Sequence, residues 1–288
     1  MHDHSATQNL FHLLEFSFIE TIKIVSLVFI MMVVIDLINI KLKGHLKKYL
    51  SGKKWRMYLL AGVFGVLPGC SGSYVTVSLY LHGTISVGAV VATMIATSGD
   101  ESFVMLSMIP KTAVILFGIL FIVGIISGFL TDIFLKRSNL CKDEECQLQE
   151  YHPLEEGWNH YITHHIYGHI IKKHLLRIFI WSFIAILLIH LLDNAFDFKA
   201  LVSAYPLITL LAAAAIGLLP ESGPHLIFVN MFAMGQIPFS ILLTSSISQD
   251  GHGMLPLLSS HLRTSVIVKI LNFLVAIIFG LCFYSLGF

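Results

Sequence analysis

Long runs of apolar residues alternate with short polar segments along most of the chain. The runs lie at 16–40, 57–82, 84–98, 102–135, 174–192, 200–219, 224–248 and 254–286. A helix needs about 20 mostly apolar residues to cross the hydrocarbon core of a bilayer, and these runs reach or approach that length. The pattern therefore predicts an all-α polytopic membrane protein.

Several runs are interrupted by glycine, proline or charged residues. The breaks Leu67-Pro68-Gly69 and Leu219-Pro220-Glu221 lie inside apolar stretches. Backbone groups that such a break frees cannot face lipid, so they need partners in protein or water. We therefore expect some helices to be broken or re-entrant.

Composition supports a membrane protein. Of 288 residues, 56% are hydrophobic and 12% are charged, and the mean hydropathy is +0.82. A soluble domain carries about 25% charged residues, which excludes a water-soluble enzyme. The net charge of +1 gives no basic field for nucleic acid, and four cysteines are too few for a disulfide scaffold.

Lysine and arginine in the loops predict the orientation. The stretch 41–56 holds seven of them and no acid, and 136–177 holds six, so both loops should be cytoplasmic. The net acidic stretch 193–199 should be external. The N-terminus should also be external, and it lacks the basic region and cleavage site of a signal peptide.

Two segments of the sequence are similar to each other. Residues 65–115 align with 217–267 without a gap, at an offset of 152. The matched pairs include three glycines, one proline and a basic residue followed by threonine: Gly65/Gly217, Pro68/Pro220, Gly83/Gly235, Gly99/Gly251 and Lys111-Thr112/Arg263-Thr264. Shared membrane composition does not easily align residues of these types. The chain is therefore predicted to contain two repeats, as many transporters do.

The charge bias gives the two repeats opposite orientations. At the same offset, 16–40 corresponds to 168–192, yet a basic loop follows the first and an acidic loop follows the second. Equivalent helices should thus cross in opposite directions. We expect about ten transmembrane helices in two inverted-topology five-helix repeats. The expected parts are a first membrane repeat at 1–135, a cytoplasmic His-rich linker at 136–173 and a second membrane repeat at 174–288.

Polar residues gather at the breaks. Inverted-repeat transporters bind substrate near the midplane, where discontinuous helices meet, and a carboxylate inside the membrane is costly unless it has a function. The predicted substrate or metal transport site consists of Cys70, Ser71, Ser98, Asp100, Glu101, Glu221, Ser222, Gln249, Asp250 and His252.

The charged residues at the breaks have structural alternatives. The acids of the second repeat could cap half-helices, and those of the first repeat could lie at a water interface between short helices. Lys111 and Arg263 could reach the lipid headgroups. As charge partners they would instead form internal ion pairs with Asp100 and Asp250.

The linker is a candidate accessory metal site. If 158–176 is helical, His160/His164 and His165/His169 are pairs spaced four residues apart, so each pair shares a helix face. Cys141 and Cys146 form a second cluster, although their spacing differs from the CxxC of structural zinc. We expect this loop to gather or sense a transition metal. The alternative is a solvated linker helix with incidental histidines.

Two segments resemble the signatures of a known family. One spans 68–111 and reads PGCSGSYVTVSLYLHGTISVGAVVATMIATSGDESFVMLSMIPK, and the other spans 246–272 and reads SISQDGHGMLPLLSSHLRTSVIVKILN. Both are similar to signatures of a bacterial ten-transmembrane heavy-metal exporter family, whose members are labelled arsenic efflux proteins or manganese transporters. The resemblance covers most of the chain except the His-rich loop. It implies a multi-pass protein of the bacterial plasma (inner) membrane.

The candidate ligands favour a divalent transition metal as substrate. Carboxylates, hydroxyls and carbonyls suit Mn²⁺, and imidazole extends the set to Zn²⁺, Fe²⁺ or Co²⁺. The chain contains no GxxxxGK[ST] phosphate-binding loop. We therefore expect a secondary-active exporter rather than an enzyme, with manganese favoured and no permanently bound cofactor. Proton exchange could occur at buried carboxylates, because burial favours their neutral form.

Two other functions stay open from the sequence. A polyprenyl-phosphate (lipid carrier) translocase, or a related lipid-phosphate protein, would hold a phosphate headgroup with half-helix N-termini, Lys111 and Arg263. An arsenite efflux permease would need thiolate ligands, and only Cys70 is placed to supply one. The expected partners are the lipid bilayer and the substrate, without nucleic acid. A homodimer is left open.

Overall fold

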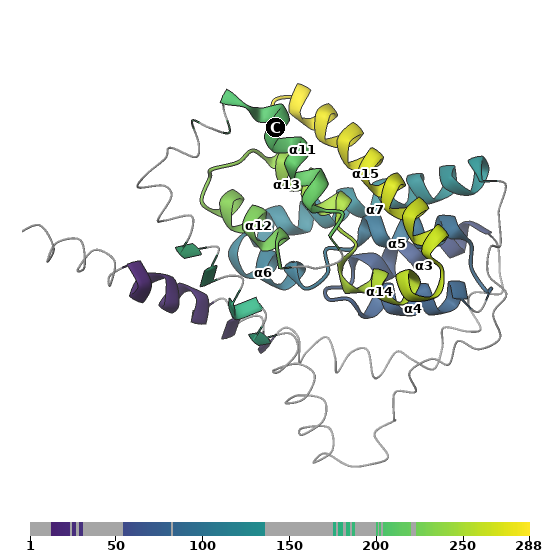
Figure 1. The fold of residues 1–288 in the computed structure, drawn as a ribbon, viewed down its shortest axis with the longest axis horizontal. Helices are drawn as coiled ribbons and strands as arrows, with labels where there is room; N and C mark the ends of the chain where they lie inside the picture. The colour runs from purple at the N-terminus through teal and green to yellow at the C-terminus, as the bar shows by residue number, and fades with distance from the viewer. Residues whose placement is uncertain are drawn as a thin grey trace, which may run out of the picture.

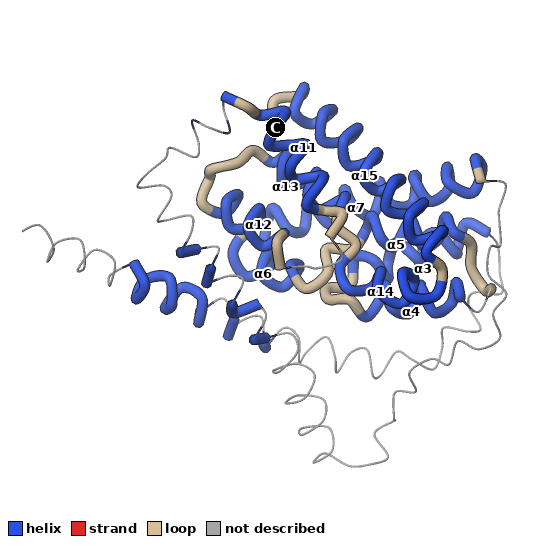
Figure 2. Tube along the Cα trace, in the orientation of Figure 1, coloured by secondary structure: helices blue, strands red, loops and turns tan. Residues whose placement is uncertain are grey.

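A computed structural model describes the parts of the chain that carry the signatures. The described residues are 13–23, 25–26, 29–30, 54–81, 83–135, 175–176, 178–180, 183–184, 186–187, 200, 202, 204–219 and 223–288. Every regular element in these ranges is a helix (Figures 1 and 2). For Lys54, His252, Ser259 and Ser260, only the backbone is described.

Besides the helical residues 13–23, five helices of the first half have described bounds. They are α3 (Lys54–Val66), α4 (Ser71–Leu81), α5 (Val87–Ala96), α6 (Glu101–Met108) and α7 (Pro110–Phe134). The side chain of Ser86 caps α5 by accepting a hydrogen bond from the backbone N–H of Ala89. All ten residues of α5 are buried, because it packs against α3, α4 and α7 and, across the molecule, α13 and α15.

The second half follows the same plan. Its elements are α11 (Pro206–Ile216), α12 (His225–Ala233), α13 (Phe239–Ser248), the 3-10 turn η3 (Gly251–Gly253), α14 (Met254–Ser260) and α15 (Leu262–Ser285). Shifting α5 by 152 residues gives the bounds of α13, and shifting the start of α7 gives the start of α15. The helix boundaries therefore recur at the offset that the sequence alignment uses.

Close helix contacts recur at the same offset. A Cβ added to Gly65 would lie 2.5 Å from the Cβ of Ala96, and one added to Gly217 would lie 2.2 Å from the Oγ of Ser248. These contacts join α3 to α5 and, 152 residues later, α11 to α13. Small residues of this kind let helices approach closely inside a membrane.

The two halves contact each other reciprocally. Helix α4 packs on α14 and α6 packs on α12, while α5 packs on its counterpart α13. Since α12 and α14 are the counterparts of α4 and α6, the contact of α4 with α14 and the contact of α6 with α12 are equivalent at the offset of 152. A two-fold relation between the halves would produce this pattern. The direction in which each half crosses the membrane stays a prediction.

Membrane-spanning character is clear in the described residues. Three segments are long and apolar enough to span: Val87–Met108, which includes the short interruption between α5 and α6, Pro110–Phe134 and Leu262–Ser285. On α15, five large apolar side chains spaced four residues apart are each at least 46% exposed: Leu262, Val266, Ile270, Leu274 and Ile278. Such a stripe favours contact with lipid over water. The total of about ten helices stays a prediction.

Candidate functional site

Two buried helix breaks lie at equivalent positions of the two halves. Helix α5 ends at Ala96 and α6 begins at Glu101, while α13 ends at Ser248 before η3. In each break one residue is extended, Thr97 in the first and Gln249 in the second. A glycine with positive φ follows in both, at +51° in the first break and +59° in the second. Glycine adopts this conformation without the steric cost that other residues meet.

The two breaks touch each other. The side-chain Nε2 of Gln249 donates to the backbone oxygen of Thr97 at 3.1 Å, and these two residues are counterparts at the offset of 152. The break after α3 joins them, because the backbone N–H of Gly69 donates to the oxygen of Gly99 at 3.1 Å. Three interruptions of the helices therefore meet in the interior. We call this region the crossing; it comprises residues 67–70, 97–101 and 249–251.

The acids of the first half lie at the crossing and are buried. Asp100 is 4% exposed and Glu101 is 1% exposed, so neither lies at a water interface. The thiol of Cys70 is 3.8 Å from Oδ1 of Asp100. Asp100 stands at the N-cap position of α6, but its side chain makes no capping hydrogen bond. Capping therefore does not account for this carboxylate.

Three buried oxygen atoms of the crossing have no hydrogen-bond partner within the described residues. They are Oγ of Ser98, Oε1 of Glu101 and Oε1 of Gln249. Buried polar atoms are normally paired, and an unpaired one calls for an explanation such as a bound ion or water. Oxygen atoms of these types are ligands for hard and borderline cations.

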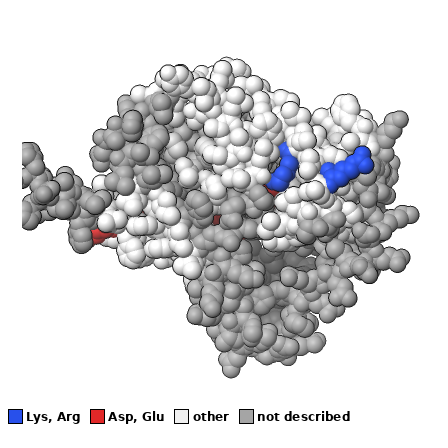
Figure 3. Space-filling view, viewed as in Figure 1, with Lys and Arg blue, Asp and Glu red and all other residues white. Residues whose placement is uncertain are grey.

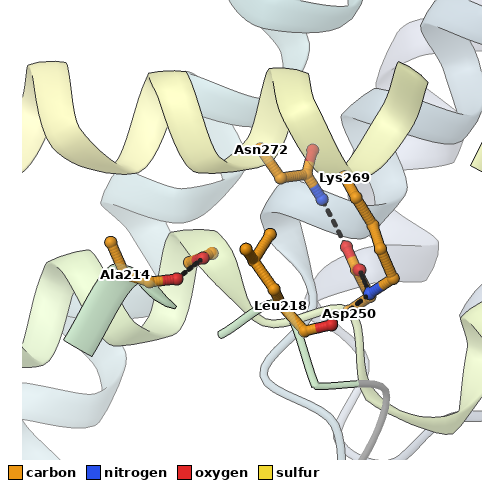
Figure 4. Close-up of polar contacts among 6 residues, drawn as sticks. Ala214, Leu218, Asp250, Lys269 and Asn272 are labelled. Carbon is orange, nitrogen blue, oxygen red and sulfur yellow. Dashed lines mark hydrogen bonds and ion pairs between the residues drawn. The ribbon is translucent and has the colours of Figure 1, made fainter. Parts of the chain in front are cut away.

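Asp250, the acid of the second half, is 0% exposed and has two partners on α15 (Figure 4). The Nζ of Lys269 is 2.5 Å from its Oδ2, and the side chain of Asn272 donates to its Oδ1. Lys269 also donates to the backbone oxygen of Leu218, at 3.0 Å. Lysine, aspartate and asparagine therefore form one network that joins α15 to the end of α11 and the second break.

Lys111 and Arg263 do not form the internal ion pairs with Asp100 and Asp250. Both are exposed, near the first turns of α7 and α15, as the headgroup alternative expects. Figure 3 shows Lys and Arg side chains on the face of the molecule that carries α15. Lys269, rather than Arg263, supplies the cation for Asp250, because it lies farther along the same helix, level with the break.

Lys269 and Asn272 are missing from the set that the sequence predicts. Their signal was a lysine and an asparagine three residues apart inside the last apolar run. Residues with that spacing share a helix face, and a charged residue inside a transmembrane segment points to a function.

A further buried pair, Nδ1 of His225 and Oγ of Ser245 at 3.1 Å, joins α12 to α13 beside the second break.

The structure brings together part of the predicted site. The members that belong to the crossing are Cys70, Ser98, Asp100, Glu101, Gln249 and Asp250, whereas Ser71 is exposed. No three His, Cys, Asp or Glu side chains within the described residues form a group that could hold a metal ion. Several predicted ligands lie outside the description: Glu221, Ser222, the His252 side chain and the linker residues Cys141, Cys146, His160, His164, His165 and His169.

A family model matches almost the whole chain. It is described as "Putative, 10TM heavy-metal exporter" and matches residues 7–186 and 176–287. The matched ranges include both signature segments, so the resemblance noted in the sequence is confirmed. Comparison with curated proteins and with solved structures finds no similar protein.

Proposed function

The chain belongs to a family of ten-transmembrane heavy-metal exporters, and we propose that it moves a divalent transition-metal cation through the crossing. Transport is secondary-active, and manganese is the favoured substrate. The observation that carries this proposal is the contact between Gln249 and Thr97, which joins two buried helix breaks that hold acids and unpaired oxygen atoms.

The chemistry of the crossing supports a cation as substrate. Its buried side chains offer carboxylates at Asp100 and Glu101 and neutral oxygens at Ser98 and Gln249. In transporters, backbone carbonyls of discontinuous helices also serve as ligands for cations. Oxygen ligands of this kind suit Mn²⁺ better than soft metals. The single nearby thiol, Cys70, gives weaker support to arsenite, which prefers several thiolates.

The reciprocal contacts support alternating access by two inverted repeats. If the halves run in opposite directions, rocking one half against the other opens the crossing to each side in turn. The pairs α4 with α14 and α6 with α12 are then the two symmetry-related gates. In this proposal a carboxylate at the crossing releases a proton when the metal binds, so that the proton gradient drives export.

The lipid-phosphate alternative receives less support. It needs basic side chains turned toward an internal headgroup site, whereas Lys111 and Arg263 are exposed and Lys269 is paired with Asp250. The carboxylates at the crossing would also repel a phosphate. We retain this alternative only as an outcome of the experiment below.

Metal flux in proteoliposomes tests the proposal. We expect the wild-type protein to move radioactive Mn²⁺ and an imposed pH gradient to accelerate it. Glu101→Gln should abolish the flux, because it removes a buried carboxylate that would bind the metal and exchange a proton, while it keeps the shape of the side chain. Lys111→Gln, which changes an exposed charge, is the matched control and should retain the flux.

A panel of other substrates distinguishes the alternatives. The same vesicles are tested with Zn²⁺, Fe²⁺, Co²⁺, arsenite and a fluorescent polyprenyl phosphate. Flux of arsenite or the lipid without flux of any divalent metal would contradict the proposal. So would full Mn²⁺ flux in the Glu101→Gln variant.

A further inference from the structure

The ion pair between Asp250 and Lys269 is a feature that metal export does not by itself require. Asp250 is 0% exposed, and the side chain of Lys269 is 14% exposed. Burying two charges costs desolvation, and apolar side chains of similar size often give an equally stable or more stable fold. Stability alone therefore does not explain why the pair is present.

The first half of the same chain provides an internal comparison. The counterparts of Asp250, Lys269 and Asn272 at the offset of 152 are Ser98, Phe117 and Leu120. Both apolar counterparts are buried, and α7 packs on α5 much as α15 packs on α13. The repeat therefore folds without an ion pair at this place. The charges are specific to the second half, where Asp250 follows the residue that contacts the first break.

The side chain of Lys269 borders a surface cavity, and its ammonium group has a second partner. A surface cavity of about 240 Å³ is lined by Leu218, Val266, Lys269, Ile270 and Phe273. The backbone oxygen of Leu218 already accepts a hydrogen bond from Nζ. If Nζ left the carboxylate, it would keep that hydrogen bond, and the flexible stem of lysine would extend along the apolar wall.

We propose that Lys269 is a tethered counter-cation, which pairs with Asp250 until a substrate cation binds there and then leaves the carboxylate while it stays hydrogen-bonded to the backbone oxygen of Leu218. This inference rests on the proposed function and names a regulatory residue for its site. The lysine keeps the buried carboxylate neutralised when no metal is present. It also makes Asp250 a ligand only for a cation that binds strongly enough to compete with the ammonium.

Chemical labelling of the wild-type protein tests the displacement without any substitution. Purified full-length protein in detergent is treated briefly with acetic anhydride, with and without MnCl₂, and acetylation is measured by mass spectrometry. We expect Mn²⁺ to raise acetylation of Lys269 severalfold, because the displaced amine loses its carboxylate partner. Acetylation of Lys111, which is exposed, should not change. Unchanged or lower labelling of Lys269 in protein that binds Mn²⁺ would overturn the inference.

Binding measurements on variants provide a second test. Lys269→Met should tighten Mn²⁺ binding by about tenfold, the order expected when a close charged competitor is removed. Asp250→Asn combined with Lys269→Met should lose this gain. Arg263→Gln, on the same helix but exposed, is the control for a general change in charge and should bind as the wild type does.

The outcomes separate this inference from the proposed function. Weaker or unchanged binding in Lys269→Met, or an equal gain in Arg263→Gln, would overturn the role of Lys269 while leaving metal transport standing. A wild-type protein that neither binds nor moves any metal of the panel would overturn the proposed function, and this inference with it.

Discussion

At the scale of single residues, the acids fall into two environments that the sequence did not distinguish. Asp100 lies beside Cys70 and Glu101 has an unpaired oxygen, whereas Asp250 is neutralised by Lys269. Breaks and charges inside apolar runs were enough to find all three acids. Their partners depend on which face of α15 packs against the second break. The spacing of the acids along the chain does not predict that face.

The ion pair gives a prediction about stability. Lys269→Met should lower the stability of the folded protein by about 3–5 kcal/mol, because it leaves Asp250 buried without its partner. The double variant that also carries Asp250→Asn should recover most of that loss, since no charge is then left alone. Thermal unfolding in detergent measures both. Equal destabilisation in the single and double variants would contradict the account of this pair.

At the scale of helices, the sequence predicted the breaks but not how the helices around them pack. The matched glycines in the alignment mark positions where the backbone turns with positive φ, at Gly99 and Gly251. The alignment also carried the helix bounds, since α5 and α13 coincide at the offset. Which helices meet across the halves depends on contacts between residues far apart in the chain, which periodicity alone does not specify.

Close packing of α5 against α7 gives a prediction at this scale. A Cβ added to Gly128 would lie 2.3 Å from the backbone oxygen of Gly88, so Gly128→Ala must push the helices apart. We expect a loss of about 1–3 kcal/mol, as for overpacking in other cores. Thermal unfolding in detergent measures the loss.

Gly118→Ala is the matched control on the same helix. A Cβ at Gly118 meets nothing within 4 Å, and alanine favours a helix over glycine. The control should therefore be neutral or slightly stabilising. If both alanine variants unfold at the same temperature, the proposed packing of α5 on α7 is not supported.

At the scale of the whole molecule, the family and the all-helical fold follow from composition and two signatures, while the orientation of the halves rests on loop charges. The reciprocal contacts of α4, α6, α12 and α14 agree with two-fold related halves. The positive-inside rule predicts how the membrane lies relative to that two-fold axis.

Loop accessibility in cells tests the orientation. Single cysteines are introduced at Lys47 and Asn194 in a cysteine-free background and treated with a membrane-impermeant maleimide. We expect labelling at position 194 in intact cells and at position 47 only after the membrane is opened. Labelling of both positions from the same side would contradict the inverted topology.

Anomalous diffraction from crystals soaked in Mn²⁺ tests the central claim most directly. The account predicts a manganese peak at the crossing, coordinated by oxygen atoms of Ser98, Glu101 or Gln249, and no such peak in crystals of the Glu101→Gln variant. A wild-type protein whose bound manganese lies elsewhere, for example only in the His-rich linker, would contradict it.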